Sequence, residues 1–134
     1  MQKAKVLIVD DDEAERRLLS AFLLSKPELE VETARDGVEA LHQLSRGGRY
    51  DVILLDVMMP LMSGVDFLDS LRALTDDPSV KTIDKTPAVI VITAASDSVL
   101  PNDAIFHRYP EVVRGVFRKP VDMARLSACL EQLR

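Results

Sequence analysis

The sequence has no long apolar run, because nowhere do about 18 apolar residues follow one another. It also opens without the charged segment and apolar core that a secretory signal requires. We therefore expect no transmembrane helix and no association with a membrane. The expected location of the protein is cytoplasmic.

Cysteine is nearly absent as well. The single cysteine, Cys129, excludes a disulfide within the chain and suits a reducing compartment. Cys129 lies between Leu126 and Leu130 in a helical pattern, so we expect it to be a small, buried hydrophobic residue.

Basic segments are also missing. The formal net charge is -5, and no stretch is rich in lysine or arginine. This balance argues against direct binding of nucleic acid by this domain. We interpret the negative charge as a contribution to solubility.

The chain is nevertheless rich in apolar residues, which make up 47% of its 134 residues and suffice for one domain with a core. Strand-like apolar runs alternate with segments of helical periodicity. Strands are expected at 4–9, 29–33, 51–56, 87–93 and 115–118. Helices are expected at 12–25, 37–45, 63–74 and 121–133.

The clearest strands, at 4–9, 51–56 and 87–93, are apolar on both faces. A parallel sheet covered by helices on both faces requires such strands. Right-handed crossovers between them give a doubly wound α/β fold. In this fold, ligands bind at the carboxyl ends of the strands.

Polar residues stand at those carboxyl ends. Three aspartates, Asp10, Asp11 and Asp12, follow the first strand, and Asp56 ends the third. Thr93 ends the fourth strand and Lys119 follows the fifth. Because the fold brings strand ends together, we expect one site with several carboxylates, a hydroxyl group and an ammonium group.

This set of groups suits phosphoryl chemistry. Clustered carboxylates repel one another, and a hard divalent cation such as Mg²⁺ removes that repulsion and bridges to phosphate oxygens. A carboxylate beside the ion can attack a phosphoryl group and form an acyl phosphate. Lys119 and Thr93 could then hold the other phosphoryl oxygens. Asp12 alone suits a helix N-cap.

Four motifs give the sequence a resemblance to a known family. They are "VLIVDDD" at 6–12, "DVILLDVMMPLMSG" at 51–64, "VIVITA" at 89–94 and "FRKP" at 117–120. Together they resemble the receiver domain of two-component response regulators. The resemblance implies a five-stranded, flavodoxin-like parallel sheet in the order 2-1-3-4-5.

The same resemblance implies roles for the acidic residues. Asp56 is expected to be phosphorylated by a histidine kinase or a histidine phosphotransfer protein. The expected ligands of Mg²⁺ or Mn²⁺ are Asp11 directly, Asp10 partly through water, Asp56, and Met58 through its backbone carbonyl.

Two further residues receive roles by resemblance. Thr93 is similar to the hydroxyl residue that responds to phosphorylation, and Lys119 to the lysine that pairs with the phosphoryl group. The bond between Lys119 and Pro120 is expected to be cis, as is usual in the family.

Three features depart from the family pattern. Val116 stands where the family usually has an aromatic residue that rotates on activation. The segment 96–115, where a helix is usual, contains Pro101 and Pro110. The connection at 75–86 is longer than usual. These departures concern signal output. We expect the loop at 94–97 to move with Thr93, and the segment 94–112 to be the most mobile part of the unmodified domain and to become better ordered on activation.

We therefore expect a single receiver domain over 1–134, standing alone or forming the N-terminal part of a longer response regulator. Its expected partner after activation is a downstream protein or output domain. Formation of a homodimer is a further alternative. The chain is expected to be a signalling acceptor and not an enzyme.

Two alternative interpretations differ from this one in the residues that they require. A metal-dependent phosphatase needs a second aspartate two residues after the first, where this chain has Met58. The alternative that stays open is a degenerate receiver that binds proteins without being phosphorylated.

Overall fold

A computed structural model describes residues 3–47, 49–56, 64–76, 87–94 and 108–133. Three subjects of the sequence predictions lie outside these residues. They are the proposed ligand Met58, the connection at 75–86 beyond residue 76, and residues 95–107, which make up most of the segments 94–112 and 96–115.

The core of the fold is one five-stranded parallel sheet in the order β2-β1-β3-β4-β5, which confirms the predicted order. Its strands are β1 (Ala4–Val9), β2 (Leu29–Ala34), β3 (Val52–Asp56), β4 (Ala88–Thr93) and β5 (Val113–Arg118). The last strand begins two residues earlier than predicted, because Val113 is buried and pairs with Val89 of β4.

The described helices are α1 (Glu13–Leu24), α2 (Gly37–Ser45), α3 (Gly64–Asp76) and α5 (Met123–Gln132). Asp12, Asp36 and Asp122 cap three of them, because each side chain accepts backbone N–H groups of the first turn. The prediction that Asp12 is an N-cap is thus confirmed. The cap at Asp122 also explains why the last helix begins later than predicted.

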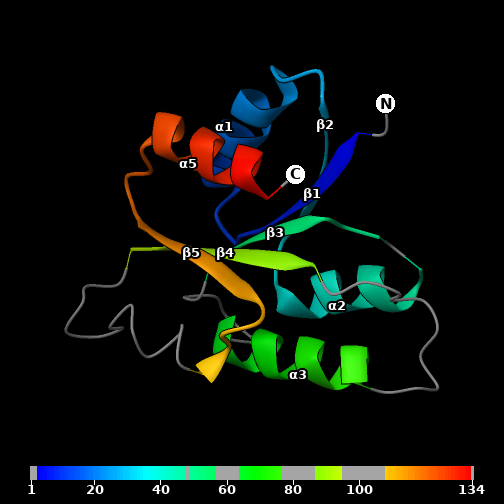
Figure 1. Cartoon of the computed structure of the whole chain (residues 1–134). Coiled ribbons are helices and arrows are strands. Elements are labelled where there is room, and N and C mark those ends of the chain that lie inside the picture. Colours follow the sequence, from blue (N-terminus) through cyan, green and yellow to red (C-terminus); the bar gives the residue numbers. More distant parts are fainter. Residues whose placement is uncertain (1–2, 48, 57–63, 77–86, 95–107, 134) are drawn as a thin grey trace.

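Helices cover both faces of the sheet, as predicted. Figure 1 shows α1 and α5 on one face and α2 and α3 on the other. Alternation along β1 supplies both layers: Val6 and Ile8 pack toward α1 and α5, whereas Leu7 and Val9 pack toward α2 and α3.

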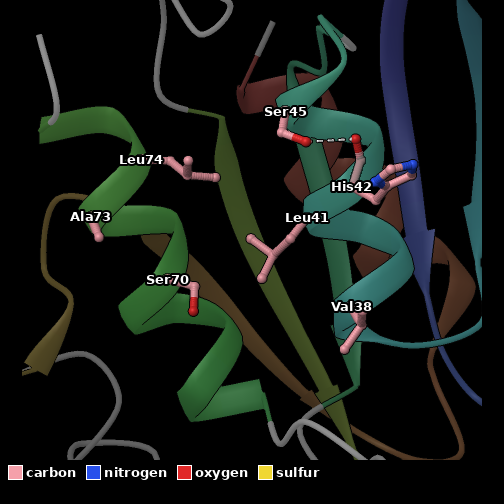
Figure 2. A pocket seen from close by; sticks show the side chains of 7 residues that line it. All are labelled: Val38, Leu41, His42, Ser45, Ser70, Ala73 and Leu74. Carbon is pink, nitrogen blue, oxygen red and sulfur yellow. Dashed lines mark hydrogen bonds between the residues drawn. The ribbon is translucent and has the colours of Figure 1, made fainter. Parts of the chain in front are cut away.

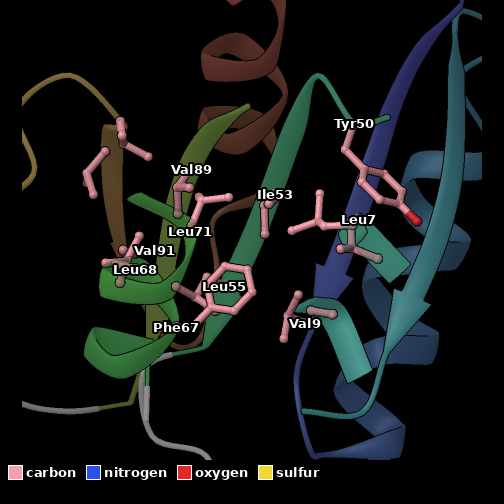
Figure 3. Packing of buried hydrophobic residues seen from close by; sticks show 14 of the residues in the cluster. Leu7, Val9, Tyr50, Ile53, Leu55, Phe67, Leu68, Leu71, Val89 and Val91 are labelled. Atoms are coloured by element: carbon pink, nitrogen blue, oxygen red, sulfur yellow. The ribbon is translucent and has the colours of Figure 1, made fainter. Parts of the chain in front are cut away.

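The layer between the sheet and α3 is shown in Figure 3. Leu55 and Val91 from neighbouring strands pack there with Phe67 and Leu71 of α3, and all four side chains are buried. Burying each large apolar side chain contributes roughly 1.5–3 kcal/mol. The strands β3 and β4 are therefore held firmly, and so are the polar residues at their ends.

Tyr109 connects α3 to the start of β5. Its hydroxyl group donates to the Asp69 carboxylate at 2.5 Å and lies 3.3 Å from the Val65 carbonyl oxygen. The guanidinium group of Arg72 lies 4.7 Å from the centre of the Tyr109 ring. Burial and the hydrogen bond to Asp69 raise the pKa of Tyr109 to about 12. The final part of the segment 96–115 is thus packed tightly against α3.

Cys129 is less buried than the sequence suggested. It is half-buried in α5 and packs at the margin of the apolar layer beneath α1 and α5. A Cβ atom added at Gly115 would lie 3.5 Å from the Cys129 sulfur. Burial raises the pKa of the Cys129 thiol, which favours a packing role over a reactive one.

An apolar groove of about 490 Å³ runs between α2 and α3 (Figure 2). Val38 and Leu41 line one side, and Ala73 and Leu74 line the other. Among the residues that the structure describes, His42 is the one titratable group in its lining.

No described helix is long and apolar enough to cross a membrane.

Candidate functional site

The candidate site begins with two aspartates on adjacent strands. Val9 of β1 pairs with Leu55 of β3, so the next residues, Asp10 and Asp56, lie side by side at the carboxyl ends of these two strands. Both are buried, with exposed fractions of 2% and 5%. Buried carboxylates need partners, because their desolvation is otherwise costly.

Lys119 supplies the opposite charge. Its ammonium nitrogen lies 3.2 Å from Asp10 Oδ2 and 3.4 Å from Asp56 Oδ2. The backbone N–H of Lys119 donates to the Thr93 carbonyl oxygen at 2.9 Å, which fixes the residue beside the end of β4. The peptide bond from Lys119 to Pro120 is cis, as predicted.

The pKa of Lys119 reflects two opposing influences. Burial alone lowers it, but the nearby charges of Asp56 and Asp10 outweigh burial, together with the hydrogen bond to Asp10. Glu15 adds a smaller effect of the same sign, and the net result is a raised pKa of Lys119. Lys119 is therefore a fixed positive charge at neutral pH.

A third carboxylate, from Asp11, completes an acidic cluster. One carboxylate oxygen from each of Asp10, Asp11 and Asp56 lies within 4.8 Å of the other two. Asp11 is exposed, so the cluster is open on one side. Mg²⁺ takes oxygen ligands and keeps several waters, and this donor set fits such a cation.

Asp10 is held at every polar atom of its backbone and side chain. Its N–H donates to the Ala34 carbonyl oxygen at 3.2 Å, and its Oδ1 accepts from the Asp12 N–H at 2.9 Å. Its carbonyl oxygen accepts from the Arg16 guanidinium at 2.7 Å. The sequence analysis missed Arg16, because an arginine in the first turns of a helix is usually solvated.

Two further residues named in the sequence predictions, Thr93 and Val116, lie on β4 and β5. Thr93 is fully buried at the end of β4, beside the backbone of Lys119. Val116 is half-buried, pairs with Val91 and packs against the layer beneath α2 and α3. The structure thus brings Asp10, Asp11, Asp56 and Lys119 together at one edge of the sheet and places Thr93 at the same edge.

Comparison with known proteins gives the family. The sequence profile of the response regulator receiver domain matches residues 6–131. The chain is 35% identical over 130 residues to the response regulator MprA of Mycobacterium leprae, covering 92% of this chain and 56% of MprA. It is 46% identical over 91 residues to the response regulator PleD of Caulobacter vibrioides, covering 68% of this chain and 18% of PleD. The chain thus spans 56% or less of the length of these two relatives.

Solved structures agree with this result. The Vibrio cholerae chemotaxis protein CheY4 matches with a TM-score of 0.77 at 30% identity, covering 98% of this chain and 99% of that chain. A receiver domain from Methylobacillus flagellatus matches with a TM-score of 0.78 at 23% identity, covering 99% of this chain and 100% of that one. The second match supports the fold alone. Because the profile covers almost the whole chain, the chain belongs to the response regulator receiver domain family.

Proposed function

We propose that this chain is a phosphorylation-activated switch of a two-component phosphorelay and that Asp56 accepts the phosphoryl group. The observation that supports this best is the position of the Asp56 carboxylate. It ends a fully buried strand, lies 3.4 Å from the Lys119 ammonium group, and has an oxygen within 4.8 Å of carboxylate oxygens of Asp10 and Asp11. A nucleophile needs such a fixed position, because reaction requires aligned atoms at close approach.

The proposed donor is a phosphohistidine of a histidine kinase or a histidine phosphotransfer protein. An Asp56 carboxylate oxygen attacks the phosphorus atom, and the bond from phosphorus to the imidazole nitrogen breaks. The electron pair of that bond stays on the nitrogen. The product is an acyl phosphate on Asp56, and hydrolysis later returns the carboxylate and inorganic phosphate.

Lys119 and Thr93 act on the phosphoryl oxygens in this proposal. The ammonium group of Lys119 already lies 3.4 Å from Asp56, so it needs only a small shift to pair with an added phosphoryl group. Thr93 ends the neighbouring strand β4, and its hydroxyl group serves as the second donor. Each movement transmits the modification to the backbone.

Asp10, Asp11 and Asp56 would hold a divalent cation, Mg²⁺ or Mn²⁺, and the Met58 carbonyl is proposed as a further ligand. When bound, the cation neutralises charge on the phosphoryl group as it is transferred. The residues of the chain contribute the fixed carboxylates and the lysine. The weak point of the site without a cation is carboxylate repulsion, which Lys119 only partly offsets.

Phosphorylation would shift an equilibrium between an inactive and an active arrangement that exists before modification. We propose a downstream protein or an output domain as the partner of the active form, and a cytoplasmic location. We propose a single receiver domain over 1–134, which stands alone or forms the N-terminal part of a longer response regulator and could form a homodimer. In this function the chain is a signalling acceptor and catalyses only its own phosphorylation and dephosphorylation.

Intact-mass measurement after incubation with acetyl phosphate tests the proposed function. With Mg²⁺ present, the protein should gain one phosphoryl group, and chelation of the metal by EDTA should prevent the gain. If no gain occurs at any Mg²⁺ concentration, the chain is a degenerate receiver that acts by binding alone.

A further inference from the structure

Arg16 makes an unusual contact for a residue on the outside of a helix. It is the fourth residue of α1, is half-buried, and donates from Nη1 to the backbone carbonyl oxygen of Asp10 at 2.7 Å. Its neighbour Arg17 is exposed and forms an ordinary surface ion pair with Glu13 four residues earlier. Two adjacent arginines of one helix therefore have different surroundings.

The contact closes the turn that carries the acidic cluster. The chain leaves β1 at Val9, passes Asp10 and Asp11, and enters α1 through the cap residue Asp12. Within this turn, the Asp12 N–H donates to Asp10 Oδ1 at 2.9 Å. Arg16 adds a bond from the body of the helix back to the end of the strand.

This bond restrains the backbone from which two ligand candidates project. Rotation about the Cα–C bond of Asp10 would move the Asp10 carbonyl oxygen away from Arg16. The same rotation would displace the Cα atom of Asp11 and the exposed carboxylate attached to it, because both follow that bond in the chain. Asp10 is buried and forms an ion pair with Lys119, so its position is already restrained. Loss of the Arg16 contact should therefore affect the position of Asp11 more than that of Asp10.

We infer that Arg16 is a positioning residue of the divalent-cation site, which fixes the Asp10–Asp11 turn through its hydrogen bond to the Asp10 carbonyl. The inference rests on the proposed metal site. It assigns Arg16 no contact with the cation. Residues that orient metal ligands without touching the metal commonly affect affinity by about 10–100-fold.

The positive charge of Arg16 predicts the opposite change in cation affinity, so an experiment can separate the charge of Arg16 from its positioning role. The guanidinium group is a positive charge near the acidic cluster, so its simple removal should strengthen the binding of a divalent cation. A loss of affinity on removal can then come only from the lost positioning. The sign of the change separates the two roles.

The test is a titration of Mn²⁺ followed by electron paramagnetic resonance of the free ion, at low ionic strength. Arg16→Met removes the charge and the donor and keeps a long apolar stem. We expect it to weaken Mn²⁺ binding by roughly 10-fold, at the lower end of that range, because the contact acts through the backbone and not on a ligand atom directly. Arg17→Met, the matched control, removes the same charge and should bind Mn²⁺ as tightly as the wild type or slightly more tightly.

Folding is checked by thermal denaturation of both variants without metal. If Arg16→Met is too unstable to titrate, Arg16→Gln serves instead, since its side chain is two bonds too short to keep the contact. Unchanged or tighter Mn²⁺ binding by the folded Arg16 variant would overturn the inference. An equal loss in the Arg17 variant would overturn it as well.

Phosphorylation gives a second readout. The Mg²⁺ concentration for half-maximal labelling by acetyl phosphate should rise in the Arg16 variant, while the rate at saturating Mg²⁺ should match the wild type. Mn²⁺ titration does not require phosphorylation, so failure of the wild type to be labelled would count against the proposed function alone. If the wild type does not bind Mn²⁺, both the proposed metal site and this inference are overturned.

Discussion

The ammonium group of Lys119 lies 3.4 Å from the Asp56 carboxylate, although the two residues are 63 positions apart in the sequence. The same ammonium group lies 3.2 Å from Asp10. In the unmodified domain, one lysine therefore serves two buried carboxylates. With Asp11 nearby, the cluster keeps an excess of negative charge, which suits a divalent cation.

The first prediction concerns stability without metal. Lys119→Ala should leave the domain folded but lower its free energy of unfolding in EDTA by about 1–3 kcal/mol. The reason is that Asp10 and Asp56 lose the ammonium group of Lys119 as their partner. Urea unfolding with and without Mg²⁺ measures this effect. Mg²⁺ should stabilise the variant more than it stabilises the wild type. Equal stability of the two proteins in EDTA would show that Lys119 does not offset the carboxylate charges.

The second prediction concerns the response of the same variant. Beryllofluoride mimics a phosphoryl group on an aspartate, and NMR shifts report how far the response spreads. Lys119→Ala should still bind beryllofluoride but give smaller shifts away from the site, because its ammonium group can no longer pair with the added oxygens. Shifts identical to those of the wild type would show that Lys119 does not couple the site to the rest of the domain.

The third prediction compares two neighbouring acids. Asp11→Ala should weaken Mn²⁺ binding more than Asp12→Ala, because Asp11 belongs to the acidic cluster and Asp12 caps α1. Asp11→Ala should also raise stability without metal, since it removes a like charge from the cluster. Asp12→Ala should lower stability by roughly 1 kcal/mol through the lost cap. Calorimetric titration and urea unfolding measure these changes. The reverse order of affinities would contradict the assignment of Asp11 as the metal ligand.

The sequence predicted the parts of the fold that depend on local patterns. The apolar run of β3 ending in Asp56, and the N-cap at Asp12, are visible within a few residues of sequence. The contact of Arg16 with the Asp10 carbonyl was not predictable, because it depends on the path of one turn. Tyr109 was missed for a different reason: its partner Asp69 lies 40 residues away, and no periodicity reports such a pair.

The fourth prediction is a pH dependence that comes from Tyr109. Its pKa in the folded protein is raised from 10.0 to about 12, by burial and by the hydrogen bond to Asp69. A raised pKa means that the folded state binds the proton more tightly than the unfolded state. The stabilisation is therefore complete below about pH 10 and is lost as the pH rises toward about 12.

Tyr109→Phe removes this titration and the hydroxyl bond to Asp69. At neutral pH the variant should be less stable than the wild type by about 1 kcal/mol, from the lost hydrogen bond. The difference should shrink between about pH 10 and about pH 12, because only the wild type loses a proton at this position. Urea unfolding across this range provides the measurement. A difference that stays constant with pH would contradict the assignment.

The proposed role of Asp56 is tested most directly by site-specific labelling with acetyl phosphate and Mg²⁺, followed by intact mass. The matched control is Asp51→Asn, which changes an aspartate just before the same strand, at the end opposite Asp56. The wild type and Asp51→Asn should each gain one phosphoryl group, and Asp56→Asn should gain none. Labelling of Asp56→Asn to the same extent as the wild type would contradict the proposal that Asp56 is the acceptor.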